Sequence, residues 1–339
     1  MDTQAPQVVK IAPDSGRTGV TPREVVFRFD EVVSERPASA ASLNALFLIS
    51  PRDGDPRVDW NRQEIAIRPR RGWKANTAYT ITMLPGIGDL RNNIRNTGVV
   101  TIFSTGPTIP SGRITGTLFN WADARTLPRA LVQARPVSDT TIVYVTSTDS
   151  VGNFTLATLG PGGYNVRGIS DDNNNRGLDP REPWDSVTVQ LADSANVELL
   201  AFVRDSIGAR IQTVNLDDSV TVRVNFDNPL AVTPPLTPSN FRVRAPDSTD
   251  VPVVSVTLPP ADTTAGVRRP SRTPPARYLI LKLARPLQPR LEYRVRVTDA
   301  RNLMGVARTS ERALVVPVPP PPSPPAAPSP VPPPPPPSR

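Results

Sequence analysis

The stretch EVVFRF, residues 24–29, alternates its side chains in the manner of a β-strand. Val25, Phe27 and Phe29 fall on one face of an extended chain and the intervening residues on the other, because successive side chains of a strand point to opposite faces. The first set is wholly apolar. The stretch therefore predicts a strand with one face against a hydrophobic core.

The same alternation recurs on both sides of this stretch, in VVKIAP, LFLISP, EIAIRP and AYTITML. Turn-forming segments separate these runs, among them PDSG, PRDGDP and NNIRNTG. Short alternating runs divided by such turns are typical of an all-β sandwich. No stretch shows a helical apolar stripe. We predict a first β-sandwich over residues 4–107.

A second unit is predicted over residues 111–203. Its short strands are GRITGTL, RALVQARPV, TIVYVTSTD, GNFTLATL, GGYNVRGIS and DSVTVQLAD, with an Asp-rich loop between the last two. A third unit, residues 209–316, echoes the first, since TVRVNFDNPLAV repeats the pattern of EVVFRFDEVVS.

In this echo Phe226 and Asp227 correspond to Phe29 and Asp30, and Asp299 corresponds to Asp89. The third unit also carries an insertion, PPADTTAGVRRPSRTPPAR, whose composition predicts a long mobile loop. Residues 317–339 form a proline tract, predicted to be a disordered, extended polyproline tail that serves as a spacer or a ligand. The fold class is thus all-β, with three tandem sandwiches and a tail.

Several of these motifs carry a resemblance to known families. DTQAPQVVKIAPDSGRTGV, VVFRFDEVVS, LISP, IAIRP, NTAYTITM and TIFSTG resemble, in that order, the bacterial SbsA-type Ig-like domain, and residues 209–316 resemble it more loosely. The middle unit is similar to carboxypeptidase-regulatory-like and transthyretin-like sandwiches through TSTDSVGNFTLATLGPGGYNVRGISDDNNN. Such domains serve as stalks or accessory modules, so the resemblance implies a structural protein of three sandwiches: Ig-like, transthyretin-like and Ig-like.

The resemblance also implies a location. In similar bacterial proteins a segment like DTQAP follows a signal peptide and a lipidated cysteine, which implies a lipid anchor on the precursor and a secreted or cell-envelope protein, in the periplasm or at the outer-membrane surface. The sequence names no partner beyond an unknown protein or glycan at the cell surface.

Composition excludes several classes of function. The chain has no cysteine and no histidine, which removes thiol nucleophiles, disulfides, the usual zinc sites and every Ser-His-Asp triad. The net charge of +8 comes almost wholly from arginines scattered without runs or interleaved aromatics, so we expect no nucleic-acid partner. No apolar run approaches the ~20 residues of a transmembrane segment. We predict that the protein is not an enzyme.

The segment DDNNNRGLDPREPWD, residues 171–185, is the one candidate site. Counted from its first Asp, it reads D-x-N-x-N-x-G-x-D-x-x-E, the spacing of a calcium-binding EF-hand loop, in which calcium takes six to eight oxygens. The predicted metal ligands are Asp171, Asn173, Asn175, Gly177 through its carbonyl, Asp179 and Glu182. The sixth position departs from the pattern because Arg176 replaces the glycine that favours positive φ.

A second interpretation of this loop stays open. Asp and Asn side chains also cap turns by bonding to nearby main-chain groups, and they populate loops without any ion. If calcium binds, we expect it to join two strands and stiffen the module, since no acid, base or nucleophile is organised around it.

Two weaker candidates are expected to be structural. Trp60, Trp73, Trp121 and Trp184 could stack on sugars, but a lone tryptophan in a sandwich is more often a packing residue. Asp30 and Glu31 could suggest glycosidase chemistry, but neighbours on a strand point to opposite faces. The predicted function is a structural or adhesive protein of the cell envelope, with a glycan-binding or protein-binding surface module as the alternative.

Overall fold

A computed structural model describes residues 3–260 and 268–317. These residues form strands, turns and two single-turn 3-10 helices, and the all-β fold class predicted from the sequence is confirmed. The chain divides into two compact units, Met1–Ser206 with Asp262–Pro275 and Ile207–Ala261 with Ala276–Arg339. Within the described ranges, no helix has the length and apolar character that crossing a bilayer requires.

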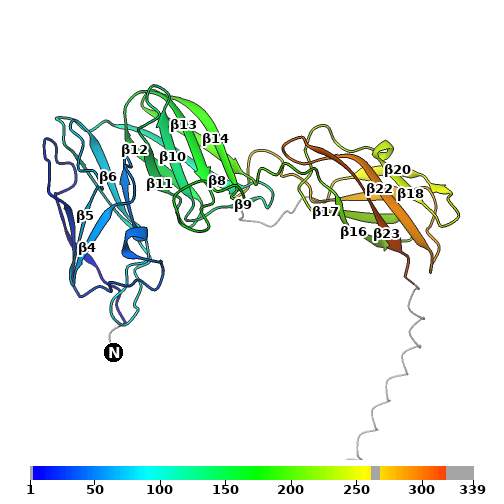
Figure 1. Ribbon diagram of the computed structural model, residues 1–339, viewed down its shortest axis with the longest axis horizontal. Coiled ribbons are helices and arrows are strands. Elements are labelled where there is room, and N and C mark those ends of the chain that lie inside the picture. The colour runs from blue at the N-terminus through cyan, green and yellow to red at the C-terminus, as the bar shows by residue number, and fades with distance from the viewer. Residues whose placement is uncertain (1–2, 261–267, 318–339) are drawn as a thin grey trace, which may run out of the picture. The chain divides into compact units, whose positions relative to one another are not determined.

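The first sandwich lies in the first unit and has two sheets (Figure 1). Their orders are β1-β2-β5-β4, with β1 (Val8–Ala12), β2 (Val25–Phe29), β5 (Glu64–Arg68) and β4 (Arg57–Asn61), and β3-β6-β7, with β3 (Phe47–Ser50), β6 (Ala78–Met83) and β7 (Val99–Ser104). On β2, Val25, Phe27 and Phe29 are at most 2% exposed. The predicted strand and its buried face are therefore confirmed.

The core of this sandwich joins its two sheets. The ring of Phe27 lies 5.5 Å from that of Phe47 on β3, in a tilted arrangement. Burial of such a side chain contributes roughly 2–3 kcal/mol. The 3-10 helix η1 (Leu43–Leu46) leads into β3 and buries Leu43 and Leu46 in the same core.

The middle sandwich also lies in the first unit. One sheet has the order β11-β10-β13-β14, with β11 (Tyr144–Ser147), β10 (Leu131–Pro136), β13 (Gly162–Ile169) and β14 (Trp184–Leu191). The other has the order β12-β8-β15, with β12 (Asn153–Leu159), β8 (Gly112–Asn120) and β15 (Ser194–Ala201), and the short β9 (Arg125–Thr126) also pairs with β8.

Gly116 on β8 is required by close packing in this sandwich. A Cβ added there would lie 2.6 Å from Cζ of Phe154 and closer still to the main-chain oxygen of Val197. Neighbouring strands thus approach β8 more closely than any side chain allows. The Asp-rich loop connects β13 to β14, as the sequence predicts.

The third sandwich makes up the second unit. Its sheets have the orders β16-β17-β21-β20, with β16 (Ile211–Asp218), β17 (Thr221–Phe226), β21 (Tyr278–Leu283) and β20 (Val253–Thr257), and β19-β18-β22-β23, with β19 (Asp250–Val251), β18 (Phe241–Arg244), β22 (Glu292–Arg301) and β23 (Ala307–Val315). The 3-10 helix η2 (Pro238–Asn240) precedes β18 as η1 precedes β3. Apart from β19, both orders match those of the first sandwich.

The echo in the sequence is therefore an echo in topology. Phe29 ends β2 and Phe226 ends β17, and each strand is the second in its sheet. The residues that follow are also equivalent: Asp30 Oδ1 accepts the main-chain N–H of Gln7 at 2.8 Å, and Asp227 Oδ1 accepts that of Arg210 at 2.9 Å. Each carboxylate holds the first strand of its sandwich against the second.

One correspondence from the sequence is wrong. The structural counterpart of Asp89 is Asn302, not Asp299. Asp89 Oδ1 accepts the N–H groups two and four residues ahead, at 2.8 Å each, and Asn302 Oδ1 does the same at 2.9 and 3.0 Å. Both residues are 3% exposed, and each forms an isolated bridge, to Val33 and to Leu230. Asp299 lies on the exposed surface with a left-handed φ of 58°.

Each sandwich has a hydrophobic core of its own. The predicted boundaries of the three units and the transthyretin-like character of the middle one stay predictions. Residues 318–339, nearly all of the predicted proline tail, lie outside the described residues, as do residues 261–267 of the insertion.

The described end of the insertion makes specific contacts, while its mobility stays a prediction. Residues 268–275 belong to the first unit and contact the middle sandwich. The main-chain N–H of Ser271 lies 3.0 and 3.1 Å from the two carboxylate oxygens of Glu198, and the indole Nε1 of Trp121 donates to the carbonyl oxygen of Thr273 at 3.1 Å. Hydrogen bonds to Glu198 and Trp121 therefore hold this segment against the middle sandwich.

Candidate metal-binding loop

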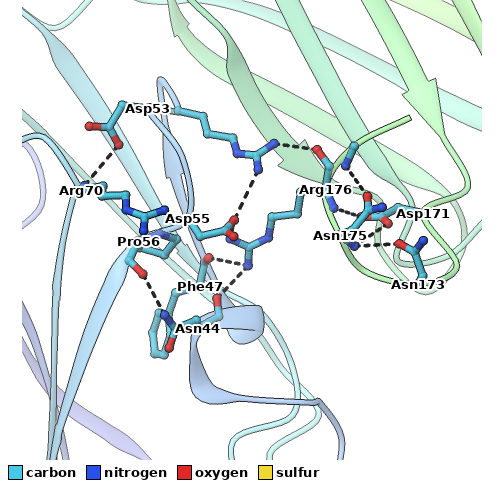
Figure 2. A network of polar contacts seen from close by, with 12 residues as sticks. Asn44, Phe47, Asp53, Asp55, Pro56, Arg70, Asp171, Asn173, Asn175 and Arg176 are labelled. Atoms are coloured by element: carbon cyan, nitrogen blue, oxygen red, sulfur yellow. Dashed lines mark hydrogen bonds and ion pairs between the residues drawn. The ribbon is translucent and has the colours of Figure 1, made fainter. Parts of the chain in front are cut away.

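The loop from Asp171 to Glu182 folds around the side chain of its first residue (Figure 2). Asp171 Oδ1 accepts the main-chain N–H of Asn175 at 3.0 Å, and Oδ2 accepts that of Arg176 at 2.9 Å. Burial raises the pKa of Asp171, while these two N–H donors oppose the rise. The carboxylate therefore organises the turn.

The two amide side chains converge on Asp179. Nδ2 of Asn173 and Nδ2 of Asn175 donate to the same oxygen, Asp179 Oδ2, at 2.6 and 2.8 Å. Their Oδ1 atoms accept main-chain N–H groups, Asn173 from Asn175 at 2.9 Å and Asn175 from Gly177 at 2.6 Å. Hydrogen bonds thus join position five to positions one and three, and position nine to positions three and five.

Glu182, at position twelve, closes the loop. Its Oε2 accepts the main-chain N–H of Asp179 at 2.9 Å, and its own N–H donates to the carbonyl oxygen of Asp179 at 3.1 Å. The residue is 6% exposed, and its Oε1 is buried without a hydrogen-bond partner. A buried carboxylate oxygen without a partner is costly, so this atom fits a cation.

The predicted ligand set depends on more than carboxylates. In the described part of the chain, no three or more Asp or Glu side chains are gathered so as to hold a metal by themselves. Within the loop, amide oxygens and a main-chain carbonyl fill the positions between the carboxylates. Hard oxygens of all three kinds are ligands for calcium.

Arg176 has the role that sequence reasoning missed. It adopts the left-handed conformation, with a φ of 58°, that glycine usually provides at the sixth position. Its side chain leaves the loop and is 9% exposed. Nη2 donates to the carbonyl oxygens of Asn44 at 2.7 Å and Phe47 at 2.9 Å, in the turn that enters β3. An arginine at a position that favours glycine was the only signal in the sequence.

Asp55 and Arg52 complete this contact. Asp55 Oδ1 lies 3.3 Å from Nη1 of Arg176 and 3.3 Å from Nη2 of Arg52. Arg52 Nη1 donates to the carbonyl oxygen of Arg176 at 2.6 Å. Burial lowers the pKa of Arg176 and the Asp55 carboxylate raises it. We call this cluster of Arg52, Asp55, Arg176 and the two carbonyl oxygens the arginine joint.

Main-chain contacts extend the arginine joint along the edge of β3. The N–H of Arg52 donates to the carbonyl oxygen of Val143 at 2.7 Å, and the N–H of Val145 on β11 donates to Oγ of Ser50 at 3.0 Å. The hydroxyls of Thr80 and Thr158 lie 3.3 Å apart. The first and middle sandwiches therefore share hydrogen bonds from strand to strand.

The other predicted candidates have structural contacts. Trp60 Nε1 donates to the carbonyl oxygen of Val33 at 3.0 Å, and Trp73 packs edge-on against Tyr79 and Phe103 at ring distances of 4.8 and 5.1 Å. Arg204 lies 3.3 Å over the ring of Trp184, and Arg272 lies 4.8 Å over that of Trp121. The four indoles are engaged by their neighbours in the fold.

Comparisons with known proteins cover the first sandwich most specifically. Residues 2–105 match the family model of the bacterial Ig-like domain. No curated protein matches the chain.

Solved structures resemble the chain only distantly. The surface layer protein SbsC, domains 1–6, is 12% identical, covers 92% of this chain and 41% of its own, and has a TM-score of 0.23. An L,D-transpeptidase from Mycobacterium smegmatis is 16% identical over 59% of this chain and 77% of its own, with a TM-score of 0.22. A putative carbohydrate binding protein from Bacteroides uniformis ATCC 8492 is 11% identical over 61% of this chain and 100% of its own, with a TM-score of 0.21. Likeness at this level supports no statement about function, and the bacterial Ig-like match of residues 2–105 ends before the Asp-rich loop.

Proposed function

We propose that the chain is a non-catalytic structural module of the bacterial cell surface, in which the first and middle sandwiches act as one rigid element. The arginine joint carries this proposal. Arg176 is buried, although arginine is rarely buried without a specific partner, and its hydrogen bonds reach carbonyl oxygens 129 and 132 residues earlier in the chain. Such a contact orders one sandwich against the next.

The proposal requires that the first and middle sandwiches do not move relative to each other. Neighbouring domains of one chain move relative to each other by default, unless their interface is large or specific. Here one guanidinium nitrogen donates to two carbonyl oxygens, and Asp55 is shared by two guanidinium groups. Hydrogen bonds from Arg52 to Val143 and from Val145 to Ser50 restrict the motion further. A spacer or stalk requires this restriction, since its purpose is to hold a set distance.

The bacterial Ig-like match of residues 2–105 supports a place at the cell surface, because modules of this kind build extended surface proteins. A glycan platform is not favoured, since the indoles are committed to packing and to stacking with arginines. Asp30, half of the carboxylate pair, binds the N–H of Gln7. Digestion of intact cells with an external protease tests the location, and full protection of the folded protein would contradict it.

Tryptophan fluorescence tests the rigid element in the full chain. All four tryptophans lie in the first unit, two in each sandwich, so thermal melts followed at this signal report on these sandwiches alone. Trp60→Phe with Trp73→Phe leaves reporters in the middle sandwich only, and Trp121→Phe with Trp184→Phe leaves them in the first only. We expect Arg176→Ala to lower the melting midpoint in each background. We also expect the midpoint of the first sandwich and that of the middle sandwich to move apart.

The matched control is Arg181→Ala, which removes an exposed arginine from the same loop. It should leave both reporters unchanged. If Arg176→Ala melts like Arg181→Ala, the two sandwiches are not coupled through the arginine joint and the proposal fails.

A further inference from the structure

We infer that the loop from Asp171 to Glu182 binds one calcium ion, and that the bound ion holds Arg176 in place and so stiffens the arginine joint. The metal site stands on the loop itself. The effect on the joint rests on the proposed function, because it requires that the two sandwiches form one element.

The loop offers oxygens of the kind and spacing that calcium takes. Hydrogen bonds join Asp171 and Asn173 to the main-chain N–H of Asn175, and both amide side chains to Asp179, so the four residues lie close together in one turn. Each amide oxygen has two lone pairs and accepts one main-chain N–H, so each keeps one lone pair for a cation. Magnesium demands a tighter octahedral arrangement and releases its water reluctantly, so calcium fits a loop of protein oxygens better.

Glu182 gives an independent indication of a cation. Its Oε2 is held by the main-chain N–H of Asp179, which turns the carboxylate toward the loop. Its Oε1 is buried and has no hydrogen-bond partner. The residue as a whole is only 6% exposed. A divalent cation at the centre of the loop would supply that partner. Position twelve is also where a bidentate carboxylate completes a calcium loop.

Arg176 connects this site to the joint through three groups of one residue. Its N–H is bound by Oδ2 of Asp171, the first ligand, and its carbonyl oxygen is bound by Arg52. Its guanidinium binds the turn before β3. A change in the order of the loop therefore reaches both sides of the joint.

Charge does not oppose this arrangement. The guanidinium of Arg176 points away from the loop and lies beside Asp55, as Figure 2 shows. The Asp55 carboxylate offsets much of its charge, so the guanidinium does not cancel the negative charge of the loop carboxylates. An ion that binds only the ordered loop favours the ordered joint by mass action.

The experiment uses the full chain with calcium chloride, magnesium chloride or a chelator. Calorimetric titration measures binding. The chain has no cysteine, so Val9→Cys with Thr188→Cys allows two nitroxide labels, at exposed positions on β1 and β14, whose distance distribution reports the joint by pulsed electron resonance. We expect calcium to bind with a stoichiometry of about one and to narrow the distribution, and magnesium to do neither at equal concentration.

Two variants separate the site from the joint. Glu182→Gln should lose at least tenfold in calcium affinity and lose the narrowing, and its melting curve in chelator shows whether it folds. Arg176→Gly restores the usual residue of the sixth position, so it should bind calcium at least as well as the original chain while its distribution stays broad with and without the ion. Arg181→Ala is the control for both and should behave like the original chain.

The outcomes distinguish the two parts. Absence of calcium binding by the original chain overturns the metal site and leaves a polar turn, whatever the joint does. Binding with an unchanged distance distribution overturns the coupling. The proposal that the two sandwiches form one rigid element is tested separately, in chelator. It fails if Arg176→Ala melts like the original chain under that condition.

Discussion

Nη2 of Arg176 lies 2.9 Å from the carbonyl oxygen of Phe47, a residue whose ring packs against Phe27 in the core of the first sandwich. One side chain from a loop of the middle sandwich thus binds the main chain at the start of a core strand. The same residue contributes its main-chain N–H to the carboxylate of Asp171. Order in the Asp-rich loop and order at the joint therefore depend on one arginine.

Arg176→Lys should destabilise the first unit although it keeps the charge. A lysine ammonium lacks the planar fork that reaches two carbonyl oxygens and Asp55 together, so at least one buried carbonyl loses its donor. We expect a loss of about 1–2 kcal/mol in the free energy of unfolding, against about 2–4 kcal/mol for Arg176→Ala. Chemical denaturation followed by tryptophan fluorescence measures both. Equal stability of Arg176→Lys and the original chain would show that charge alone is sufficient.

Gly116→Ala should destabilise the middle sandwich. The new methyl group would collide with the ring of Phe154 and the carbonyl oxygen of Val197, which overpacks the site and costs about 1–3 kcal/mol. Gly160→Ala is the matched control, since an added Cβ there meets nothing within 4 Å. Denaturation followed at Trp121 and Trp184 compares the two variants, and a similar midpoint for both would contradict the packing argument.

Acid should destabilise the first sandwich through Asp89. Burial opposes ionisation of this carboxylate, but N–H groups of Asn93 and Arg91 outweigh it and place the pKa of Asp89 below its ordinary value. Because the folded pKa lies below the unfolded one, the stabilisation is complete above the unfolded pKa of about 3.9 and is lost as pH falls through the folded value.

Asp89→Asn tests this dependence. Asn302 makes the same two main-chain bonds in the third sandwich with an amide oxygen, so the substitution should keep the turn at neutral pH and remove its contribution to acid sensitivity. Melting midpoints at Trp60 and Trp73, measured from pH 7 to pH 2.5, give the comparison. Parallel pH curves for the variant and the original chain would assign the acid sensitivity elsewhere.

Glu198→Ala should release the segment around Ser271. The carboxylate accepts the main-chain N–H of Ser271 with both oxygens, and this anchor holds a run that contains Arg268, Arg269 and Arg272. We expect trypsin to cut after Arg268 and Arg272 several times faster in the variant under native conditions, because a protease needs a freed backbone; Arg269 precedes a proline and is not a cleavage site. Asp193→Ala, an exposed carboxylate elsewhere in the same unit, is the control and should keep the original rate.

Local sequence determined the strands of this protein and much of their arrangement. The alternation in residues 24–29 established which face of β2 is buried, because side chains of a strand alternate whatever surrounds them. The repeated pattern indicated that the first and third sandwiches are copies of one domain, and their strand orders agree with this apart from β19. The candidate ligands all fall within twelve consecutive residues, so the sequence alone placed them on the one loop between β13 and β14.

Tertiary structure alone decided what these local features contact. The pairing of Asp89 with Asn302 depends on which residue closes an isolated bridge to Val33 or Leu230, and a shift of three residues leaves the strand pattern unchanged. Arg176 looked like a defect in a metal loop because its partners at Asn44, Phe47 and Asp55 are 121 to 132 residues away. The local preferences of a sequence give no information about contacts between residues so far apart along the chain. Only the packing of one folded sandwich against another brings these groups within hydrogen-bond reach and makes burial of the arginine favourable.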